Sequence, residues 1–244
     1  MDDDLTGLAV VVGGASGIGA EVAAQQRAAG ATVVVWDIRG DHDLTCDVSD
    51  PAQVDAAMAV TVERWGVPTW CTVSAGVGHA AMLLDVDPDD WDRIQAVNAR
   101  GPLLAMRACA RRMIEAGTGG SIVATSSVSA HLPDRSMGAY CASKAALDMV
   151  VKVAAVEWAS YGIRVNAVAP GVTDTPMLGG APLDRGWLRH VAGRTPLGAV
   201  GSPDAIARAV VALHGLPWVT GQVLPCDGGL ALHSPIDPTG HLSR

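Results

Sequence analysis

The sequence is poor in aromatic residues. It contains no phenylalanine and only two tyrosines among 244 residues, although it has seven tryptophans. A tyrosine that takes part in proton transfer must therefore be Tyr140 or Tyr161. Only Tyr140 has a lysine one helical turn away, at Lys144, so Tyr161 is the weaker candidate.

Charged residues and long apolar runs are also scarce. Charged residues make up 17% of the chain and the net charge is −8, which argues against nucleic-acid binding and leaves no basic surface for anionic membranes. The apolar runs are short and interrupted by Gly, Asp or Pro, so none is long enough to span a bilayer. Residues 1–4 are acidic where a secretory signal would be basic. We therefore expect a soluble, cytoplasmic protein that binds neither nucleic acid nor membrane.

The five cysteines are widely separated and include no C-x-x-C pair. We expect reduced thiols that pack as small core residues. The seven histidines show no metal-ligand spacing, so no catalytic metal is expected.

Apolar residues are abundant, at 49% of the chain, and the length suits one large α/β domain. Short apolar strands alternate with helices, which is typical of a parallel sheet covered on both faces. The predicted strands span 8–12, 31–36, 69–73, 121–125, 163–169 and 222–224, and the predicted helices span 17–29, 51–65, 88–115, 138–160 and 203–214. A break or kink is expected at Gly101-Pro102. The sequence thus predicts a single α/β domain over residues 1–244, with a Rossmann-like doubly wound parallel sheet of about seven strands and helices on both faces.

One connection is unusually short. Only residues 38–45 separate the second predicted strand from a further strand candidate at 46–48. A parallel crossover normally takes a dozen or more residues, usually a helix. We therefore expect a loop here, which leaves this side of the sheet open or covered by another subunit.

A glycine-rich segment, Gly13 to Gly19, follows the first strand and opens a helix. Glycines let a backbone approach a pyrophosphate, and a helix N-terminus supplies N–H groups and a favourable dipole. Asp37 ends the second strand, where a carboxylate can accept hydrogen bonds from an adenosine ribose. A ribose 2′-phosphate would meet this negative charge, so NAD is favoured over NADP. Arg39 is the contrary signal, and we interpret it as a solvated loop residue.

The pair Tyr140 and Lys144 suits a reaction in which an alcohol loses its proton while its carbon loses a hydride. Free tyrosine has a pKa near 10, and a neighbouring cation favours the phenolate and lowers that pKa. A decrease of roughly 3 units requires about 4 kcal/mol, which a partly buried site can supply. Alone, this spacing more often marks a packing tyrosine beside an exposed lysine, so the rest of the chain decides.

Taken together, the motifs resemble those of the short-chain dehydrogenase/reductase family, in particular its 3-oxoacyl reductases and hydroxysteroid dehydrogenases. The resemblance covers residues 5–229. It rests on Gly-x-x-x-Gly-Ile-Gly at 13–19, Asn98 within a long helix, Ser127, Tyr140-x-x-x-Lys144, the stretch 163–171 that ends in Pro170-Gly171, and Asp227-Gly-Gly229.

The resemblance implies a role for each matching residue. Tyr140 becomes the general acid/base, Lys144 perturbs it and binds the nicotinamide ribose, and Ser127 binds the substrate oxygen. Asn98 positions a water that links Lys144 to solvent; without the resemblance, an asparagine bonded to backbone is the favoured interpretation. Asp47 and Val48 contact adenine, and Thr173 and Thr175 hold the carboxamide. The implied cofactor-binding residues are Gly13, Ser16, Gly17, Ile18, Gly19, Asp37, Asp47, Val48, Ala75, Gly76, Asn98, Tyr140, Lys144, Pro170, Gly171, Thr173 and Thr175.

Two positions depart from the family pattern. The family usually begins its glycine loop with threonine, and we assign that place to Gly13. The Asn-Ala-Gly that follows its fourth strand is Ser74-Ala-Gly76 here, which alters a side-chain contact that braces the sheet. Both departures bear on cofactor affinity.

The implied reaction is reversible hydride transfer between NAD(H) and a secondary alcohol or ketone, in a homotetramer of the kind that family members commonly form. The residues expected around the substrate are mostly apolar, which suits a hydrophobic or alicyclic substrate; His79 and His131 are candidates for orienting it. These residues are Val77, His79, Met82, Ser129, His131, Met177, Leu178, Trp187 and Leu188.

Two alternatives stay open. An NADP-dependent 3-oxoacyl-carrier-protein reductase would prefer a basic docking patch, and Asp37 and the acidic balance weigh against it. A non-catalytic dinucleotide-binding sensor or scaffold is disfavoured because Asn98, Ser127, Tyr140 and Lys144 are all present.

Overall fold

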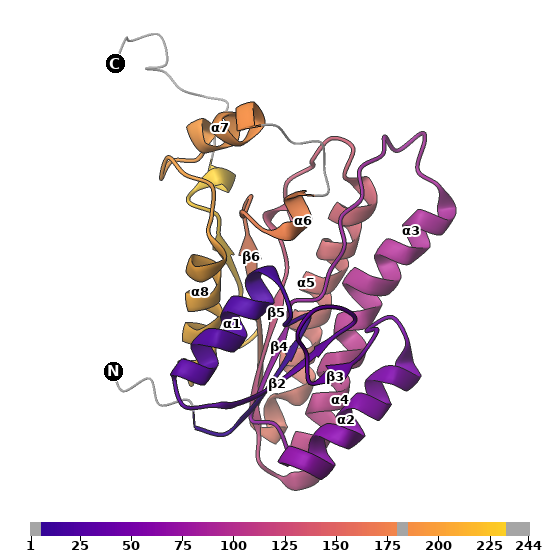
Figure 1. The fold of residues 1–244 in the computed structure, drawn as a ribbon, viewed down its shortest axis with the longest axis vertical. Coiled ribbons are helices and arrows are strands. Elements are labelled where there is room, and N and C mark those ends of the chain that lie inside the picture. Colours follow the sequence, from indigo (N-terminus) through magenta and orange to yellow (C-terminus); the bar gives the residue numbers. More distant parts are fainter. Residues whose placement is uncertain (1–5, 180–184, 233–244) are drawn as a thin grey trace.

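The computed structural model describes residues 6–179 and 185–232. Seven parallel strands form one sheet in the order β3-β2-β1-β4-β5-β6-β7 (Figure 1). The strands are β1 (Leu8–Val12), β2 (Thr32–Asp37), β3 (Leu44–Thr45), β4 (Trp70–Val73), β5 (Gly120–Thr125), β6 (Ile163–Pro170) and β7 (Val223–Cys226). The predicted α/β class with a doubly wound parallel sheet is confirmed.

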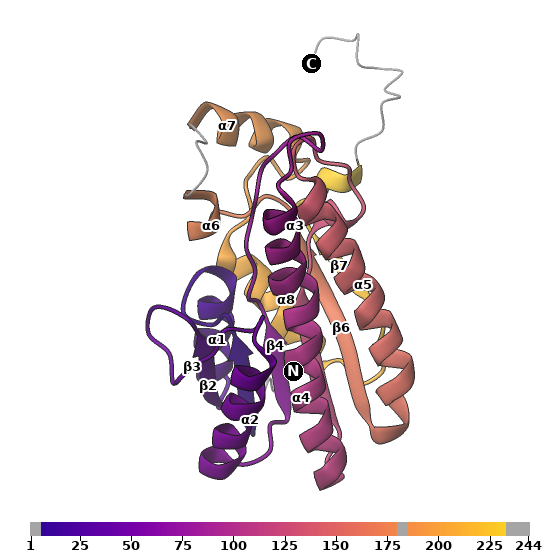
Figure 2. The same ribbon diagram turned by 90° about the vertical axis from the view of Figure 1, so that its right-hand side faces the viewer.

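Helices cover both faces of this sheet (Figures 1 and 2). On one face lie α1 (Gly17–Ala28) and α8 (Pro203–Gly215), which contact each other. On the other face lie α2 (Pro51–Trp65), α4 (Gly101–Ala116) and α5 (Gly138–Trp158), and Figure 2 shows α3 (Pro88–Gln95) continuing into α4 beside α5. Beyond the carboxyl ends of the strands lie α6 (Pro176–Gly179) and α7 (Arg185–Arg194). Short 3₁₀ turns span Val128–Ala130, Ala159–Tyr161 and Leu230–Leu232.

The continuous apolar run of β1 results from burial on both of its faces. Val10 and Val12 belong to the core beneath α2, α4 and α5, whereas Ala9 and Val11 belong to the core beneath α1 and α8. Successive side chains of a strand point to opposite faces, so a strand between two helical layers needs apolar residues throughout.

Aspartates begin two of the helices, as the Asp-Pro steps predict. The Asp50 carboxylate accepts a hydrogen bond from the Ala52 N–H at 2.9 Å, and Asp87 accepts one from Asp89 at 2.8 Å. In both cases proline occupies the first turn, where its missing N–H costs no intrahelical hydrogen bond.

The expected break at Gly101-Pro102 is a π-helical segment, Ala96–Arg100, between α3 and α4. A Cβ atom at Gly101 would lie 2.7 Å from Val48 Cγ2, so the close packing here requires glycine. The segment contains the buried Asn98. Single π turns inside helices occur frequently at functional sites, which draws attention to this position.

The third strand differs from its prediction. We expected it at 46–48, but β3 is Leu44–Thr45 and the next residues lead toward α2. The intervening residues 38–43 are a loop without a helix, as expected. The crossover is short because Asp43 bonds directly to the edge of β2: its N–H donates to the Val35 carbonyl and its carboxylate accepts from the Val35 N–H at 2.8 Å.

The sequence interpretation contained neither α6 nor α7. The four residues of α6 are too few to show a helical period, and α7 begins next to residues 180–184, which lie outside the described part of the chain. The tail after Gly229 is described only as far as Leu232.

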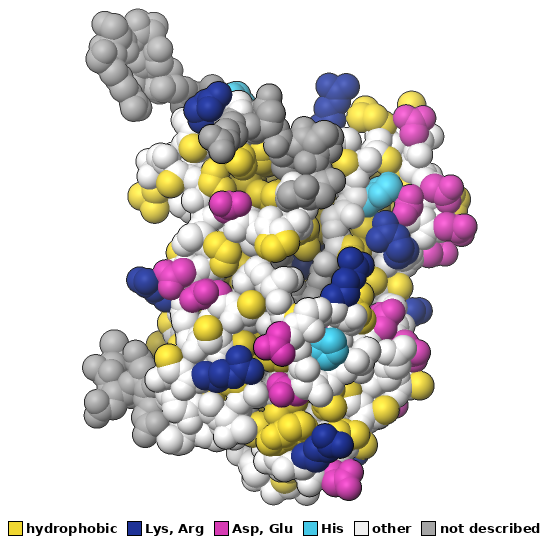
Figure 3. Space-filling model, viewed as in Figure 1, with side chains coloured by type: hydrophobic (Ala, Val, Ile, Leu, Met, Phe, Trp, Pro, Cys, Tyr) yellow, Lys and Arg dark blue, Asp and Glu magenta, His cyan; other side chains and the backbone are white. Residues whose placement is uncertain are grey.

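The surface is unevenly charged. Figure 3 shows Asp and Glu side chains gathered over α3, whereas Lys and Arg side chains are scattered over this face. Within residues 6–179 and 185–232 no helix is long and apolar enough to cross a membrane. The same residues contain no cluster of three or more His, Cys, Asp or Glu placed to hold a metal ion.

Candidate active site

The candidate site lies at the carboxyl edge of the sheet, where β1 and β4 are neighbours. The register pairs Val12 with Trp36 on one side and with Val73 on the other. The chain builds β2 and β3 on one side of β1 and the remaining strands on the other side. Open α/β sheets bind ligands at such a switch point, in the crevice outside the strand ends.

The glycine loop is packed too closely for side chains. A Cβ atom at Gly19 would lie 2.0 Å from the Gly13 carbonyl oxygen, and one at Gly13 would lie 2.4 Å from the Ala75 N. Ser16, the N-cap of α1, forms no side-chain capping bond. The loop therefore leaves backbone N–H groups and a helix N-terminus open toward the crevice, and this cradle fits a dinucleotide pyrophosphate.

The assignment of the family's threonine position to Gly13 is wrong. Gly13 has a φ of +74°, and its contact with Ala75 leaves no room for any Cβ atom. The residue before it, Val12, ends β1. Gly13 is thus one of the glycines that the loop requires.

Asp37 is fixed against the glycine loop. Its Oδ2 accepts a hydrogen bond from the Ala15 N–H at 3.0 Å, and its Oδ1 accepts from Ile38 at 2.7 Å and from Arg39 at 3.3 Å. A carboxylate has about four acceptor sites and these three N–H groups occupy three of them, so capacity for one ribose hydroxyl remains. The side chain is therefore pre-oriented at the carboxyl end of β2.

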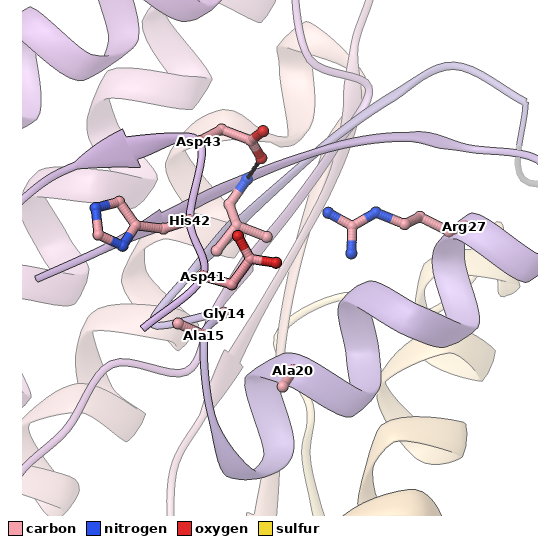
Figure 4. Close-up of a pocket in the computed structure, with 8 residues that line it drawn as sticks. Gly14, Ala15, Ala20, Arg27, Asp41, His42 and Asp43 are labelled. Carbon is pink, nitrogen blue, oxygen red and sulfur yellow. Dashed lines mark hydrogen bonds between the residues drawn. The ribbon is translucent and has the colours of Figure 1, made fainter. Parts of the chain in front are cut away.

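Behind Asp37 the loop 38–43 leaves a hollow of about 200 Å³ between itself and α1 (Figure 4). Gly14 and Ala15 form one wall, and Arg27, Asp41 and Asp43 line the others. The expected open side of the sheet therefore exists, and it is bordered by two carboxylates and one guanidinium.

The residues expected near adenine are held by local contacts. Asp47 Oδ1 accepts hydrogen bonds from the Ser49 N–H at 2.8 Å and from the Ser49 hydroxyl at 2.7 Å. Val48 is buried against Gly101. The carboxylate is therefore positioned by its own turn, and the valine anchors that turn in the core.

The strand end of β6 supplies the opposite side of the cradle. Pro170 ends β6, and Gly171 packs on Asp227, with its Cβ position 3.0 Å from Asp227 Cα. The Thr173 hydroxyl donates to the Gly171 carbonyl at 3.0 Å. Thr175 faces the glycine loop, because a Cβ atom at Gly17 would lie 3.5 Å from Thr175 Cβ. Ile18 packs into the core beneath α8 and does not line the crevice with its side chain.

Tyr140, Ser127 and Lys144 lie together above this cradle. The Ser127 hydroxyl lies close enough to the Tyr140 phenol to lower its pKa, and it accepts a hydrogen bond from the Ser129 N–H at 3.1 Å. Lys144 Nζ lies 5.7 Å from the centroid of the Tyr140 ring and donates to the Thr125 carbonyl at 2.8 Å. A Cβ atom at Gly76 would lie 3.8 Å from Lys144 Nζ, so the loop after β4 forms the adjoining wall.

The pKa values correct one expectation. Lys144 does not lower the pKa of Tyr140 here: burial of the phenol raises that pKa, against a smaller opposite effect of the Ser127 hydrogen bond. Burial also lowers the pKa of Lys144, to about 8, while the Asp148 carboxylate opposes this decrease. Desolvation disfavours the charged form of both groups and is the largest cause of each shift. The protein therefore holds a neutral phenol beside an ammonium of reduced pKa.

Asn98 is bonded to backbone. Its Oδ1 accepts from the Val77 N–H at 2.8 Å, and its Nδ2 donates to the Val77 carbonyl at 2.9 Å and to the Ser143 hydroxyl at 3.2 Å. The side chain thus clamps the loop after β4 onto α5, beside Gly76. The role of Asn98 in holding a water stays a prediction.

Ser74 supplies a brace of its own. Its hydroxyl bonds with the Thr125 hydroxyl at 2.7 Å, which ties the end of β4 to the end of β5. Thr125 is also the residue whose carbonyl accepts from Lys144. Although Ser74 stands where the family pattern has asparagine, the ends of β4 and β5 are still joined by a side-chain hydrogen bond.

Comparisons with known proteins agree with this geometry. The family model described as enoyl-(acyl carrier protein) reductase matches residues 13–231. The chain is 31% identical over 240 residues to the 2,5-dichloro-2,5-cyclohexadiene-1,4-diol dehydrogenase LinX of Sphingobium indicum, which covers 91% of this chain and 95% of that protein. It is 33% identical, over the same length and with the same coverage, to the cis-4-hydroxycyclohexanecarboxylate dehydrogenase of Sinomonas cyclohexanicum. A short-chain type dehydrogenase/reductase structure from Mycobacterium marinum matches with a TM-score of 0.90 and 29% identity, covering 95% of this chain and 98% of that one.

The chain belongs to the short-chain dehydrogenase/reductase family. It is therefore an oxidoreductase that acts on CH–OH groups with a nicotinamide dinucleotide.

The residues predicted to face the substrate of this short-chain dehydrogenase differ in where the structure places them. Met177 lies over the site, 3.8 Å from the Cβ position of Gly76. Three polar candidates contact carboxylates of the protein. His79 Nε2 lies 3.6 Å from Asp90, the Ser129 hydroxyl donates to Asp134 at 2.6 Å, and His131 Nε2 lies 3.1 Å from Asp148. Val77 is held by Asn98, Met82 is exposed, and Leu178, Trp187 and Leu188 are half-buried on α6 and α7.

The sequence interpretation missed Ser126 and Asp148, which form a buried hydrogen bond behind the Tyr140–Lys144 pair. One signal could have found Asp148. It follows Lys144 by four residues, as Lys144 follows Tyr140, so the three side chains lie on one helix face.

The raised pKa of Tyr140 can be measured directly, because the chain has only one other tyrosine. In a Tyr161→Phe variant, which replaces an exposed side chain, the tyrosinate absorbance reports Tyr140 alone. We expect its midpoint to lie above ~10, the value of a free tyrosine, because burial disfavours the phenolate. A midpoint below that value in the cofactor-free protein would contradict this account.

Proposed function

We propose that this short-chain dehydrogenase/reductase transfers a hydride reversibly between NAD(H) and a secondary alcohol or ketone. The observation that carries the proposal is the Tyr140 phenol with the Ser127 hydroxyl next to it and the buried Lys144 ammonium 5.7 Å from its ring, at the same edge of the sheet as the glycine loop. A non-catalytic dinucleotide sensor has no need for this costly burial of an ammonium next to a phenol.

In the direction of ketone reduction, the substrate oxygen lies between the Ser127 and Tyr140 hydroxyls. Ser127 donates a hydrogen bond to the oxygen, and Tyr140 transfers its proton to it while the carbonyl carbon receives a hydride. A nicotinamide held by the glycine loop and Asp37 would supply this hydride, and would accept one from the alcohol carbon in the opposite direction. Lys144 then returns a proton toward Tyr140. Because the pKa of Tyr140 is raised, the protein alone is prepared to donate a proton, and alcohol oxidation is favoured by alkaline conditions.

The cofactor preference rests on Asp37. Its carboxylate is fixed beside Ala15, and Asp41 and Asp43 border the hollow behind it. A 2′-phosphate placed there would meet this negative potential, which supports NAD over NADP. Arg27, which also lines this hollow, carries the opposite charge.

The substrate class rests on the apolar lining and on the relatives. Met177 covers the site, and the half-buried Leu178 and Leu188 lie on the helices above the strand ends. Two similar proteins bear the names of dehydrogenases for six-membered-ring alcohols. We therefore propose a hydrophobic or alicyclic secondary alcohol or ketone.

A 3-oxoacyl-carrier-protein reductase remains the second candidate, since the matching family model is described by an acyl-carrier-protein activity. The net charge of −8 and the acidic surface over α3 disfavour an acidic carrier protein as partner.

We further propose that residues 1–244 act as one domain within a homotetramer. Exposed apolar side chains support an interface around the last helix and strand. Trp218 is 98% exposed just after α8, and Leu216 and Leu224 are also exposed nearby.

Replacing Tyr140 with phenylalanine removes only the proton-transferring hydroxyl. We expect turnover to fall by about 10²–10⁴-fold, while NADH binding, measured by fluorescence, stays close to wild type. Tyr161→Phe is the matched control and should retain full activity. A Tyr140→Phe protein that keeps even about a tenth of wild-type turnover would refute the assignment.

Replacing Asp37 with serine should shift the preference toward NADP by roughly thirtyfold to a hundredfold. This is the effect of removing about 2–3 kcal/mol of repulsion between unit charges some 6 Å apart at an effective dielectric constant near 20. The readout is kcat/KM for each cofactor. Asp41→Ser removes a charge from the same loop, and a much smaller shift is expected there. Wild-type preference for NADP would show that the cofactor proposal is wrong.

A substrate screen separates the candidate functions. We expect cyclic ketones and alcohols to react with NADH or NAD, and acyl-carrier-protein thioesters to react poorly. Efficient NADPH-dependent reduction of a 3-oxoacyl thioester would favour the second candidate. Tight dinucleotide binding without turnover of any compound would favour a sensor.

A further inference from the structure

A third ionisable side chain continues the line formed by Tyr140 and Lys144. Asp148 lies one helical turn beyond Lys144 on α5 and is only 3% exposed. Residues four apart on a helix share a face, so the phenol, the ammonium and the carboxylate follow one another along α5. The reaction proposed above gives no role to this carboxylate.

The two oxygens of the Asp148 carboxylate differ in their contacts. The Ser126 hydroxyl donates to Oδ1, and His131 Nε2 lies 3.1 Å from Oδ2 in an ion-pair contact. Oδ2 itself is buried and accepts no hydrogen bond in the described part of the chain. Ser126 directly precedes Ser127, and His131 follows the 3₁₀ turn that Ser127 caps, so the segment that carries Ser127 also fixes Asp148.

The charges around this carboxylate are few. On α5 they are Lys144 one turn before and the exposed Lys152 one turn after; from the segment after β5 only His131 faces it. Lys144 itself is buried, donates to the Thr125 carbonyl, and has Tyr140 and Asn98 as its other polar neighbours. Asp148 is therefore the one carboxylate described near this buried ammonium; burial raises its pKa, and the Ser126 hydrogen bond and the charges of His131, Lys152 and Lys144 oppose that rise.

We propose that Asp148 is a positioning residue for proton transfer, whose buried negative charge keeps Lys144 protonated beside Tyr140. The inference rests on the proposed function and adds a third member to the Tyr140–Lys144 pair.

The direction of the effect follows from the electrostatics. Burial lowers the pKa of Lys144 to about 8, and the Asp148 charge opposes that decrease. Without the carboxylate charge, Lys144 loses its proton at a lower pH. The pair then becomes a poorer proton source for ketone reduction near neutrality.

The composition of the chain permits a direct test. It contains only two lysines, Lys144 and Lys152. Protein grown with lysine isotopically labelled at Cε therefore gives two side-chain NMR signals, and a Lys152→Gln variant assigns them. We expect the Lys144 signal to titrate with a midpoint at about 8 in wild type, and about one unit lower in Asp148→Asn. The Lys152 signal should not move by more than a few tenths of a unit and serves as the internal control.

A Lys144 midpoint that stays the same or rises in Asp148→Asn would overturn the inference. Circular dichroism checks folding, and Asp148→Ser replaces the asparagine variant if that protein does not fold, because it also removes the charge. In wild type and variant, the alkaline limb of the kcat/KM profile for ketone reduction should move down with the Lys144 midpoint, which mere loss of stability would not cause.

The two proposals fail separately. The NMR titration needs neither cofactor nor turnover, so a shifted Lys144 midpoint in a protein that reduces no ketone would leave the Asp148 inference standing and refute the reaction. An active wild type whose Lys144 midpoint is insensitive to Asp148 would refute the inference and leave the reaction.

Discussion

The hydrogen bond from the buried Lys144 ammonium to the Thr125 carbonyl is the interaction on which the site depends. It ties α5 to the end of β5, and the Thr125 hydroxyl in turn bonds with Ser74 at the end of β4. Removing a charge from water costs several kcal/mol unless hydrogen bonds and opposite charge compensate it. Lys144 is therefore held in one position by its hydrogen bond and its burial. Tyr140 lies one turn before it on the same helix, so its position is restrained as well.

The parallel sheet makes this arrangement possible from segments that are far apart in the sequence. All strands end at one edge, so the turns after β1, β4, β5 and β6 meet there. The close approach of Gly13 to Ala75 and of Gly17 to Thr175 defines the depth of the cradle. Asn98 adds a clamp from a π-helical turn, which holds the loop after β4 at the height of Lys144. Backbone packing and not side-chain bulk thus shapes the cofactor side of the crevice.

The sequence predicted what depends on local pattern and failed where tertiary packing decides. Six of the strands were predicted; burial on both faces demands apolar runs in inner strands such as β1, whereas β7 is largely exposed, and the Asp-Pro steps predicted two helix starts. The position of β3 was wrong because the Asp43 side chain bonds to the edge of β2, which no periodicity reveals. The sequence also did not reveal that His131 faces Asp148, because this partner lies on another element; its role toward a substrate stays a prediction. The pKa of Tyr140 was misjudged for the same reason: spacing indicates a neighbouring cation but not the extent of burial.

Burial shifts the pKa values of Tyr140 and Lys144 in opposite directions, and this affects ketone reduction and alcohol oxidation differently. A free phenol and a free lysine amine have nearly equal pKa values, about 10 and 10.4. Here the pKa of the phenol rises and that of the amine falls to about 8, so Lys144 loses its proton before Tyr140 does. The protein by itself therefore stabilises the proton-donating form of Tyr140 and provides little stabilisation for its phenolate. Alcohol oxidation needs that phenolate, so it requires either alkaline solution or an additional positive charge facing the ring.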